Sequence, residues 1–209
     1  MAIEIDYDKI YHTKHYGDFK VVESLGYINN DSRLWVKVRF LNTGTERKVR
    51  YDALSYVTDL HDPYAPIIHG VGYIGEDYGS RNVYKREYDR WINILSRCYN
   101  ENDNSYHNYG AMGVRVDERW HNFSNFYRDI RELPGYRFKT QDPFGYALDK
   151  DYLQYGVPKD QKVYSRDTCV WIPRGINTSI NYTDSSTELD YVDRQGNLKK
   201  MQMYHLVNE

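Results

Sequence analysis

The sequence predicts an α+β protein in which a small antiparallel β module precedes a larger domain of helices and short strands. Residues 18–51 alternate apolar and polar side chains in short runs separated by turn residues, as in a sheet with one buried face. Residues 84–133 instead carry apolar side chains at the spacing of amphipathic helices. Hydrophobic residues make up 40% and charged residues 28% of the 209 positions, which argues against a disordered chain.

A three-stranded antiparallel sheet is expected in the N-terminal module. Its strands are predicted over Asp18–Leu25, Leu34–Leu41 and Glu46–Tyr51, with turn residues in both gaps. Apolar side chains alternate with basic ones, so the sheet should have one apolar and one basic face. The basic face includes Lys37, Arg39, Lys48 and Arg50. DNA could lie against this face, but a solvated sheet face also commonly carries Lys and Arg, and both interpretations remain open.

Pro-rich and Gly-rich residues separate the two parts of the chain. His61–Pro66 and the glycines that follow, up to Gly75, favour turns over regular structure. We therefore expect four segments. These are residues 1–62 as the β module, 63–83 as a linker, 84–182 as the α+β domain, and 183–209 as a tail with a hairpin around Arg194–Asn197.

The second domain should begin with two helices. The clearest helical pattern covers Tyr84–Tyr99, and a second helix is expected over Asn122–Leu133, ended by Pro134 and Gly135. Between them, Tyr106–Trp120 predicts an aromatic turn that leads into a short strand. Three tryptophans lie in apolar stripes and are expected in the core rather than stacked on bases: Trp91, Trp120 and Trp171.

Charge is unevenly distributed along the chain. The formal net charge of −2 argues against binding a polyanion through bulk charge. Residues 81–140, however, hold 11 Lys and Arg against 8 Asp and Glu. Candidate contacts to the phosphates of double-stranded DNA are Arg86, Arg90, Arg97 and Arg174. The 23 tyrosines suit either a wet nucleic-acid interface or a polar core.

The two cysteines, Cys98 and Cys169, are too few for a disulfide framework and lack the spacing of a zinc site. We expect both to be reduced and buried. The chain shows neither an export signal nor a run approaching the roughly 20 apolar residues of a membrane span. A cytoplasmic protein without a membrane partner is the expectation.

The C-terminal third predicts a strand, a loop, a second strand and a helix. The strands are expected over Tyr146–Leu153 and Thr168–Ile172, and the helix over Arg174–Tyr182 with Pro173 in its first turn. This order is a compact way to aim side chains from a strand end and a helix at one point.

Four short polar side chains suit such a point. Asp149 and Asp151 should share a face of the first strand, and Asn177 and Asn181 a face of the helix. Carboxylate and amide oxygens are ligands suited to Mg²⁺ or Mn²⁺. In the simpler alternative, the aspartates pair with Lys150 or a nearby arginine and Asn177 bonds to local backbone.

The segments YALDKDYL and YSRDTCVWIPRGIN resemble the ββα-metal motif of HNH endonucleases, especially the phage homing type. The tract from Tyr88 to Phe126, VKVRFLNTGTERKV and GVGYIG are similar to segments of HNH-like or AP2-like phage proteins. The resemblance implies an endonuclease in the cytoplasm of a phage's host cell that binds DNA and nicks or cleaves it. It also implies that Asp149 and Asn177 bind the metal ion.

Lys150 occupies the position of the catalytic histidine in that motif. A lysine side chain in water has a pKa of about 10.4 and is a cation at neutral pH, so a lysine here would contact the scissile phosphate rather than act as a base. Alternatively, the protein kept the ββα scaffold without nuclease activity and binds DNA or blocks a host protein. Three histidines, His69, His107 and His121, are expected to be ordinary loop residues.

Overall fold

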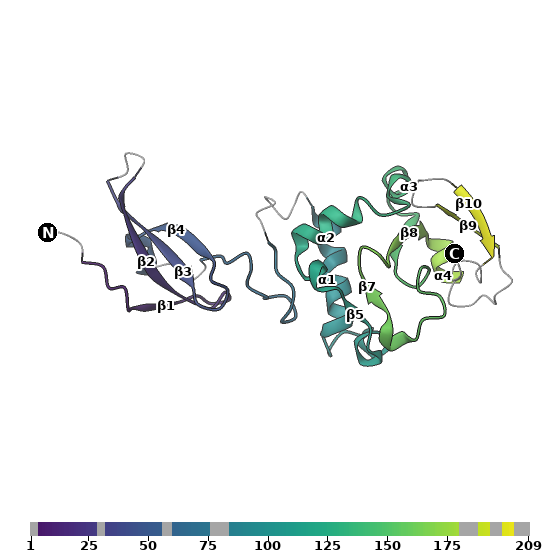
Figure 1. The fold of residues 1–209 in the computed structure, drawn as a ribbon, viewed down its shortest axis with the longest axis horizontal. Coiled ribbons are helices and arrows are strands. Elements are labelled where there is room, and N and C mark those ends of the chain that lie inside the picture. Colours follow the sequence, from purple (N-terminus) through teal and green to yellow (C-terminus); the bar gives the residue numbers. More distant parts are fainter. Residues whose placement is uncertain are drawn as a thin grey trace. The chain divides into compact units, whose positions relative to one another are not determined.

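The structure is a computed structural model that describes residues 4–28, 32–55, 60–75, 84–179, 188–192 and 198–202. Strands and helices occur together, and the predicted α+β class is confirmed (Figure 1). The chain divides into two compact units. Unit 1 is Met1–Ile67 with Tyr73–Asp77, and unit 2 is Ile68–Gly72 with Tyr78–Glu209.

Unit 1 is a four-stranded antiparallel sheet in the order β1-β2-β3-β4. The three predicted strands are present as β2 (Asp18–Tyr27), β3 (Leu34–Phe40) and β4 (Glu46–Arg50), and a 3₁₀ turn, η1 (Asp52–Ser55), follows. The additional strand β1 (Ile10–His12) was missed, because three residues are too few to show an alternating pattern.

The core of unit 1 lies on one face of this sheet. Val36, Val38 and Phe40 are fully buried and pack with Phe19, Val21 and Leu54. The opposite face carries the basic residues, because the β3–β4 register sets Lys37 opposite Lys48 and Arg39 opposite Glu46.

Residues 63–75, expected within a linker, make specific contacts in each unit. In unit 1, the buried Asp62 carboxylate accepts hydrogen bonds from the Thr43 hydroxyl at 2.5 Å and the Tyr64 amide at 2.9 Å. In unit 2, Ile68 and Gly72 form an antiparallel bridge. These residues are therefore built into the two folds.

Unit 2 begins with both predicted helices. They are α1 (Lys85–Tyr99) and α2 (Phe123–Ile130), and the Asn122 side chain caps α2 by accepting the Ser124 amide at 2.8 Å. The segment between them contains η2 (Tyr106–Asn108), η3 (Gly110–Met112), β5 (Arg115–Val116) and η4 (Glu118–His121).

Pro134 and Gly135 lead into a short helix that was not predicted, α3 (Tyr136–Gln141). Gly135 has a φ of 83°, and a Cβ there would lie 2.1 Å from the Trp171 carbonyl oxygen. The Pro134 carbonyl accepts the Trp171 amide at 2.9 Å. This turn is thus packed directly against the strand that contains Trp171.

The predicted order of strand, loop, strand and helix is present. β6 (Tyr146–Asp149) pairs antiparallel with β8 (Val170–Pro173), and α4 (Arg174–Ser179) follows. The intervening loop contains η5 (Lys159–Gln161) and β7 (Val163–Tyr164), which pairs in parallel with β5. The tail hairpin is β9 (Glu188–Val192) with β10 (Leu198–Gln202). Residues 180–182, at the end of the expected helix, and thus Asn181, lie outside the described part.

Trp91, Trp120 and Trp171 are at most 1% exposed, so their prediction as core residues is confirmed. Each indole N–H is also bonded internally, to the Trp120 carbonyl, the Asp129 carboxylate and the Ile130 carbonyl respectively. No helix in the described ranges combines the length and hydropathy needed to cross a bilayer.

Candidate functional site

One pocket of unit 2, of about 460 Å³, brings together residues that come from α1, β6, the loop before β8, and α4. The candidates Asp149, Lys150 and Asn177 all line it, and so does Arg97. We call it the lysine pocket. Its other lining residues are Asn108, Tyr109, Leu148, Asp151, Val157, Lys159, Lys162 and Tyr164.

The chain turns away from the strand immediately after Asp149. The Asp149 carboxylate accepts the backbone N–H of Tyr152 at 2.7 Å, a bond that stabilises a turn rather than a continuing strand. The strand therefore ends at Asp149 and not at Leu153. The prediction that Asp149 and Asp151 share a strand face was wrong for this reason.

Burial raises the pKa of the Asp149 carboxyl to about 6, and the charge of Asp151 contributes in the same direction. The hydrogen bond from the Tyr152 amide acts in the opposite direction. Near neutral pH this carboxyl is therefore close to its own titration range, unlike an exposed aspartate.

Lys150, Asp151 and Lys162 form a cluster of ion pairs in which Lys150 is buried and the other two are partly exposed. The two carboxylate oxygens of Asp151 accept from Lys150 Nζ and Lys162 Nζ, each at 2.7 Å. Burial acts to raise the pKa of Asp151, but the two lysines outweigh it and hold that pKa below the ordinary value. The Lys150 side chain is only 2% exposed.

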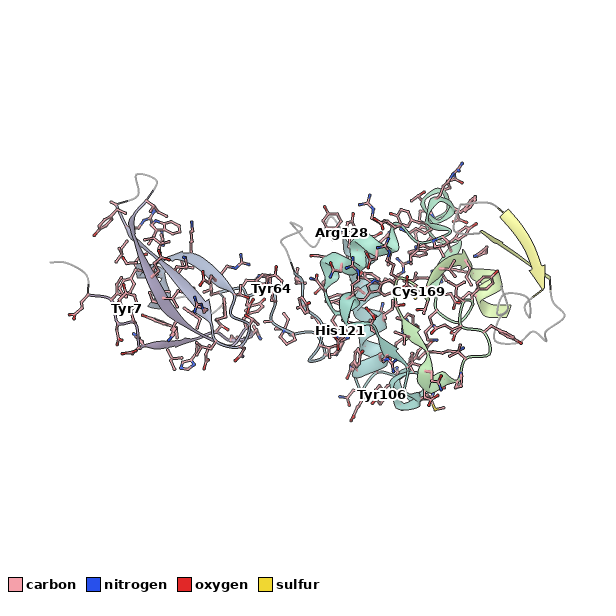
Figure 2. All side chains as sticks on the ribbon, in the orientation of Figure 1. Tyr7, Tyr64, Tyr106, His121, Arg128 and Cys169 are labelled. Carbon is pink, nitrogen blue, oxygen red and sulfur yellow. The ribbon has the colours of Figure 1, made fainter. Side chains whose placement is uncertain are left out.

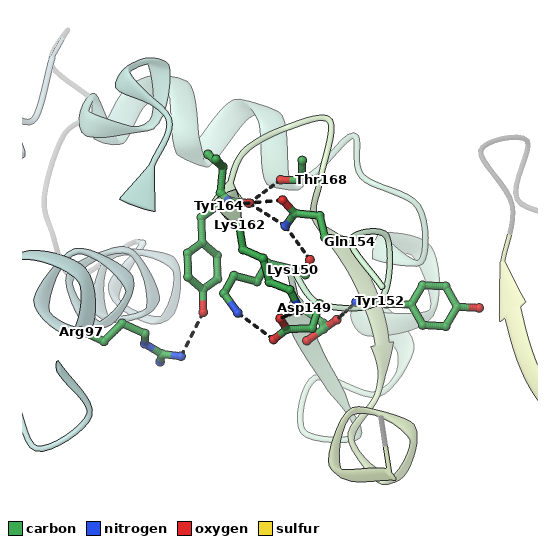
Figure 3. Close-up of polar contacts among 10 residues, drawn as sticks. Arg97, Asp149, Lys150, Tyr152, Gln154, Lys162, Tyr164 and Thr168 are labelled. Carbon is green, nitrogen blue, oxygen red and sulfur yellow. Dashed lines mark hydrogen bonds and ion pairs between the residues drawn. The ribbon is translucent and has the colours of Figure 1, made fainter. Parts of the chain in front are cut away.

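Two tyrosine rings enclose the Lys150 ammonium. Its nitrogen lies 5.0 Å from the ring centre of Tyr109 and 5.3 Å from that of Tyr164. Arg97 also stacks over Tyr109, at 5.0 Å, and donates to the Tyr164 hydroxyl at 3.4 Å (Figure 3). Burial raises the pKa of Tyr164 well above its ordinary value, so its phenol stays neutral.

The Gln154 side chain joins the turn after β6 to β7. Its amide donates to the carbonyls of Lys150 at 2.7 Å and Val163 at 3.0 Å, and it accepts the Val163 N–H at 3.0 Å. Because Gln154 is itself buried, these bonds hold the backbones of Lys150 and Val163 in a defined relation.

The lysine pocket is positively charged. Its lining includes the four cations Arg97, Lys150, Lys159 and Lys162, against the two carboxylates of Asp149 and Asp151. Both carboxylates already accept hydrogen bonds from the protein. Such a pocket attracts anions.

The donor set does not suit Mg²⁺ or Mn²⁺. Both oxygens of Asp151 are bonded to lysines, one oxygen of Asp149 is bonded to an amide, and a lysine ammonium is buried beside them. Within the described ranges, no group of three or more His, Cys, Asp or Glu side chains could hold a metal ion. Mg²⁺ is usually bound by one or two carboxylates together with waters, and here three of the four carboxylate oxygens of Asp149 and Asp151 are already engaged by a backbone amide and two lysines, so the residues present fit it poorly.

A second pocket, of about 360 Å³, lies along α1, and we call it the arginine pocket. All four arginines of unit 2 that were predicted to bind phosphates line it: Arg86, Arg90, Arg97 and Arg174. Three of these arginines, together with Asn93, lie on α1. Along the chain, Arg86, Arg90, Asn93 and Arg97 are spaced four, three and four residues apart, which places them on one face of the helix. Arg97 lines both pockets, so the two are adjacent.

The arginines of this pocket lie on aromatic rings and close to one another. Arg90 lies 4.7 Å from the Trp171 ring centre and Arg86 lies 4.8 Å from that of Phe144. Burial lowers the pKa of Arg90, and the positive charges of Arg174 and Arg86 act in the same direction. Its buried Nη1 has no hydrogen-bond partner among the described residues.

The basic face of unit 1 is largely neutralised by acidic neighbours. Lys37 pairs with Glu23, Arg39 pairs with Glu46 at 2.6 Å, and Arg50 lies 3.3 Å from Asp52. Lys48 makes no ion pair with a residue in the described part of the chain. The face therefore has much less uncompensated positive charge than its sequence suggests.

A further pocket, of about 540 Å³, is lined by residues between Asp117 and Cys169 and offers less free positive charge. Its two arginines are occupied, because Arg119 pairs with Asp129 at 2.7 Å and Arg166 pairs with Glu132 at 2.8 Å. We therefore take the two cationic pockets as the candidate site, although the pocket between Asp117 and Cys169 is larger than either.

The histidines lie outside both cationic pockets. His107 is exposed and bonds to its neighbour Asn108 at 2.8 Å, while His121 bonds to the Tyr99 hydroxyl at 3.2 Å. Sequence reasoning missed the contributions of Tyr109, Lys159, Lys162 and Tyr164. The last three belong to the loop before β8, which shows no periodic pattern.

Comparison of the chain with protein-family models, with curated proteins and with solved structures finds no match. The interpretation of the two pockets therefore depends on their own geometry and charge.

Proposed function

We propose that this protein binds double-stranded DNA through the arginine pocket of unit 2. The observation that carries the proposal is the convergence of Arg86, Arg90, Arg97 and Arg174 on one pocket, in a chain whose net charge is −2. In the described part, Arg86, Arg90 and Arg97 form no ion pair with a carboxylate, and Asp89 in the same pocket is paired with Lys85 at 2.7 Å. The positive charge is thus local and available to a polyanion.

The geometry of α1 suits a nucleic-acid backbone. Eleven residues separate Arg86 from Arg97, a length of about 17 Å along the helix axis. Phosphates on one strand of B-DNA advance by about 3.4 Å along the duplex axis per nucleotide. The helix face can therefore contact several phosphates, which supports binding without base-specific readout.

Binding of a fluorescent DNA duplex, measured by anisotropy at several salt concentrations, tests the proposal. The logarithm of the affinity should fall linearly with the logarithm of the salt concentration, by about 0.9 per phosphate contact. Replacing Arg86 and Arg97 together by Gln should reduce the slope by about two. Arg115→Gln is the matched control, since Arg115 is an exposed arginine outside both pockets. Equal slopes for all three proteins would contradict the proposal.

Phosphodiester cleavage is a second candidate, favoured by the presence of Asp149, Lys150 and Asn177 on one pocket next to the arginines. With a pKa of about 6, Asp149 has the properties of a general base near neutral pH. The likeness of this segment to the HNH motif points to the same reaction. Without cleavage, the protein would be a DNA-binding protein that retains only the scaffold.

Nicking of supercoiled plasmid in Mg²⁺, Mn²⁺ or EDTA decides whether cleavage occurs. Lys150→His would restore the histidine of the HNH motif, and it should raise nicking, by up to the roughly 10²–10⁴-fold typical of general-base assistance, if an imidazole is a more effective base here than the Asp149 carboxylate. Asp149→Asn should lower nicking. If the native protein leaves the plasmid intact in every buffer and Lys150→His does not change this, the cleavage hypothesis is wrong.

A further inference from the structure

We infer that the lysine pocket is a binding site for one phosphate group, held without a metal ion by Arg97, Lys159 and Lys162 above the buried ammonium of Lys150. This inference rests on the proposed function only in naming nucleic acid as the source of the phosphate. The pocket's own charge and geometry carry the rest.

The charges that line the lysine pocket favour an anion. Asp151 is shared between Lys150 and Lys162, so its single negative charge is already engaged by two cations. Arg97 and the exposed Lys159 form no ion pair with a carboxylate of the described chain. Even with Asp149 ionised, the lining has two positive charges in excess, which a phosphate with a charge of about −1 to −2 would neutralise.

The lysines of the pocket are already held in place by other residues. Lys150 is fixed by Asp151 and by the rings of Tyr109 and Tyr164, and Lys162 is fixed by the other oxygen of Asp151. Cations that are already in place need little reorganisation when an anion arrives, and burial weakens the screening of their charge. The Lys150 side chain is too buried to be a principal ligand of the phosphate. Its positive charge instead stabilises the bound phosphate electrostatically.

The hydrogen-bond donors of the lysine pocket come from several elements. Arg97 reaches the pocket from α1, Lys159 from η5 and Lys162 from the start of β7, while the Asn177 amide lines it from α4. A phosphate offers several acceptor oxygens in a tetrahedral arrangement and can accept from donors that converge from different sides. A carboxylate presents its acceptor sites in one plane and therefore suits donors that converge from different sides less well.

The phosphate could be an internal phosphodiester of DNA or a terminal monoester. Arg97 borders both pockets, so a strand that contacts the arginine pocket can place its next phosphate, or its phosphorylated end, in the lysine pocket. The chemistry of recognition is the same for both sources, and the experiment separates them.

The test begins with inorganic phosphate as the probe, titrated into the full-length protein in EDTA at constant ionic strength and followed by thermal unfolding. Phosphate should raise the unfolding temperature of the native protein in a saturable manner. Lys159→Glu should weaken phosphate binding at least tenfold, whereas Lys14→Glu, with the same change at an exposed lysine of unit 1, should not. Because Lys159 is exposed, neither variant should impair folding. Duplexes with and without a 5′-phosphate, compared in the same buffer, then identify the source.

A saturable effect in EDTA that Lys159→Glu removes supports the inference. Phosphate binding that appears only after Mg²⁺ is added would overturn it, and so would equal responses of Lys159→Glu and native protein. These results do not depend on the residues that line only the arginine pocket. If Arg86 and Arg97 variants still change the salt dependence of duplex binding while inorganic phosphate has no effect in EDTA, the pocket assignment fails and the DNA-binding proposal stands.

Discussion

At the scale of single residues, Asp149 has two opposing effects on stability. Its carboxylate ends β6 by accepting the Tyr152 amide, which stabilises the turn, yet burial disfavours its charged form. A carboxyl whose pKa is higher in the folded than in the unfolded chain stabilises the fold when protonated. This contribution is fully present below about pH 4 and is lost as the pH rises through about 6.

Asp149→Asn should therefore change the dependence of stability on pH. The amide oxygen can still accept the Tyr152 N–H, but no buried charge forms, so at pH 7.5 the variant should be more stable than the native protein by about 2–3 kcal/mol. At pH 4 the two should be nearly equal. Urea unfolding at both pH values measures the difference, and Asp149→Ala, which also loses the hydrogen bond, should be destabilised even at pH 4. A difference between the native protein and Asp149→Asn that is independent of pH would show that burial does not perturb this carboxyl.

At the scale of elements, α1 combines a structural face with a cationic face. Tyr88, Trp91, Leu95 and Cys98 are buried on one side, while the arginine stripe follows another. The sheet of unit 1 has a similar division into apolar and basic faces, but acidic residues lie within its basic face. The same residue types thus have different electrostatic consequences on the two elements.

Replacing the cations of β3 and those of α1 by neutral residues compares how much each element contributes to DNA binding. Replacing Lys37 and Arg39 together by Ala should reduce the salt slope of duplex binding less than the paired Gln substitutions at Arg86 and Arg97 do. The reason is that Glu23 and Glu46 already neutralise the sheet cations. Anisotropy titrations over the same salt range provide the measurement. A slope reduced by about two in the sheet variant would instead assign phosphate contacts to β3, as the sequence pattern allows.

At the scale of the whole molecule, each unit has a hydrophobic core of its own. The core of unit 1 is built on β2 and β3, while Cys98 and Cys169 lie in the core of unit 2, where Cys169 is surrounded by packed side chains (Figure 2). Burial of both cysteines was predicted and is confirmed. Burial raises the pKa of Cys98 to about 12 and raises that of Cys169 as well, so neither is a reactive thiolate.

Thiol labelling should consequently report the unfolding of unit 2 alone. Native protein should react slowly with a thiol reagent until denaturant unfolds unit 2. Val38→Ala creates a cavity in the core of unit 1 and should lower the free energy of unfolding of unit 1 by about 2 kcal/mol, but it should not accelerate the reaction of the cysteines. Ile130→Ala, in the core of unit 2, should accelerate it. Equal acceleration by both substitutions would mean that the two units unfold as one.

The sequence by itself determined the elements whose signal is local. The helices around Trp91 and Phe126, the three longer strands of unit 1 and the order of strand, loop, strand and helix around Asp149 follow from periodicity and turn residues. Asp149, Lys150 and Asn177 were also recognised together, since the topology of that motif brings a strand end and a helix to one place.

Only the tertiary structure decided what surrounds those residues. Arg97 and Tyr164 are 67 positions apart, and Lys162 reaches Asp151 because β7 pairs with β5 and Gln154 anchors the turn. No local pattern encodes such contacts. The balance between cations and carboxylates, which distinguishes an anion site from a metal site, depends on which side chains meet in space. A sequence shows the charges, but their pairing is a property of the folded chain.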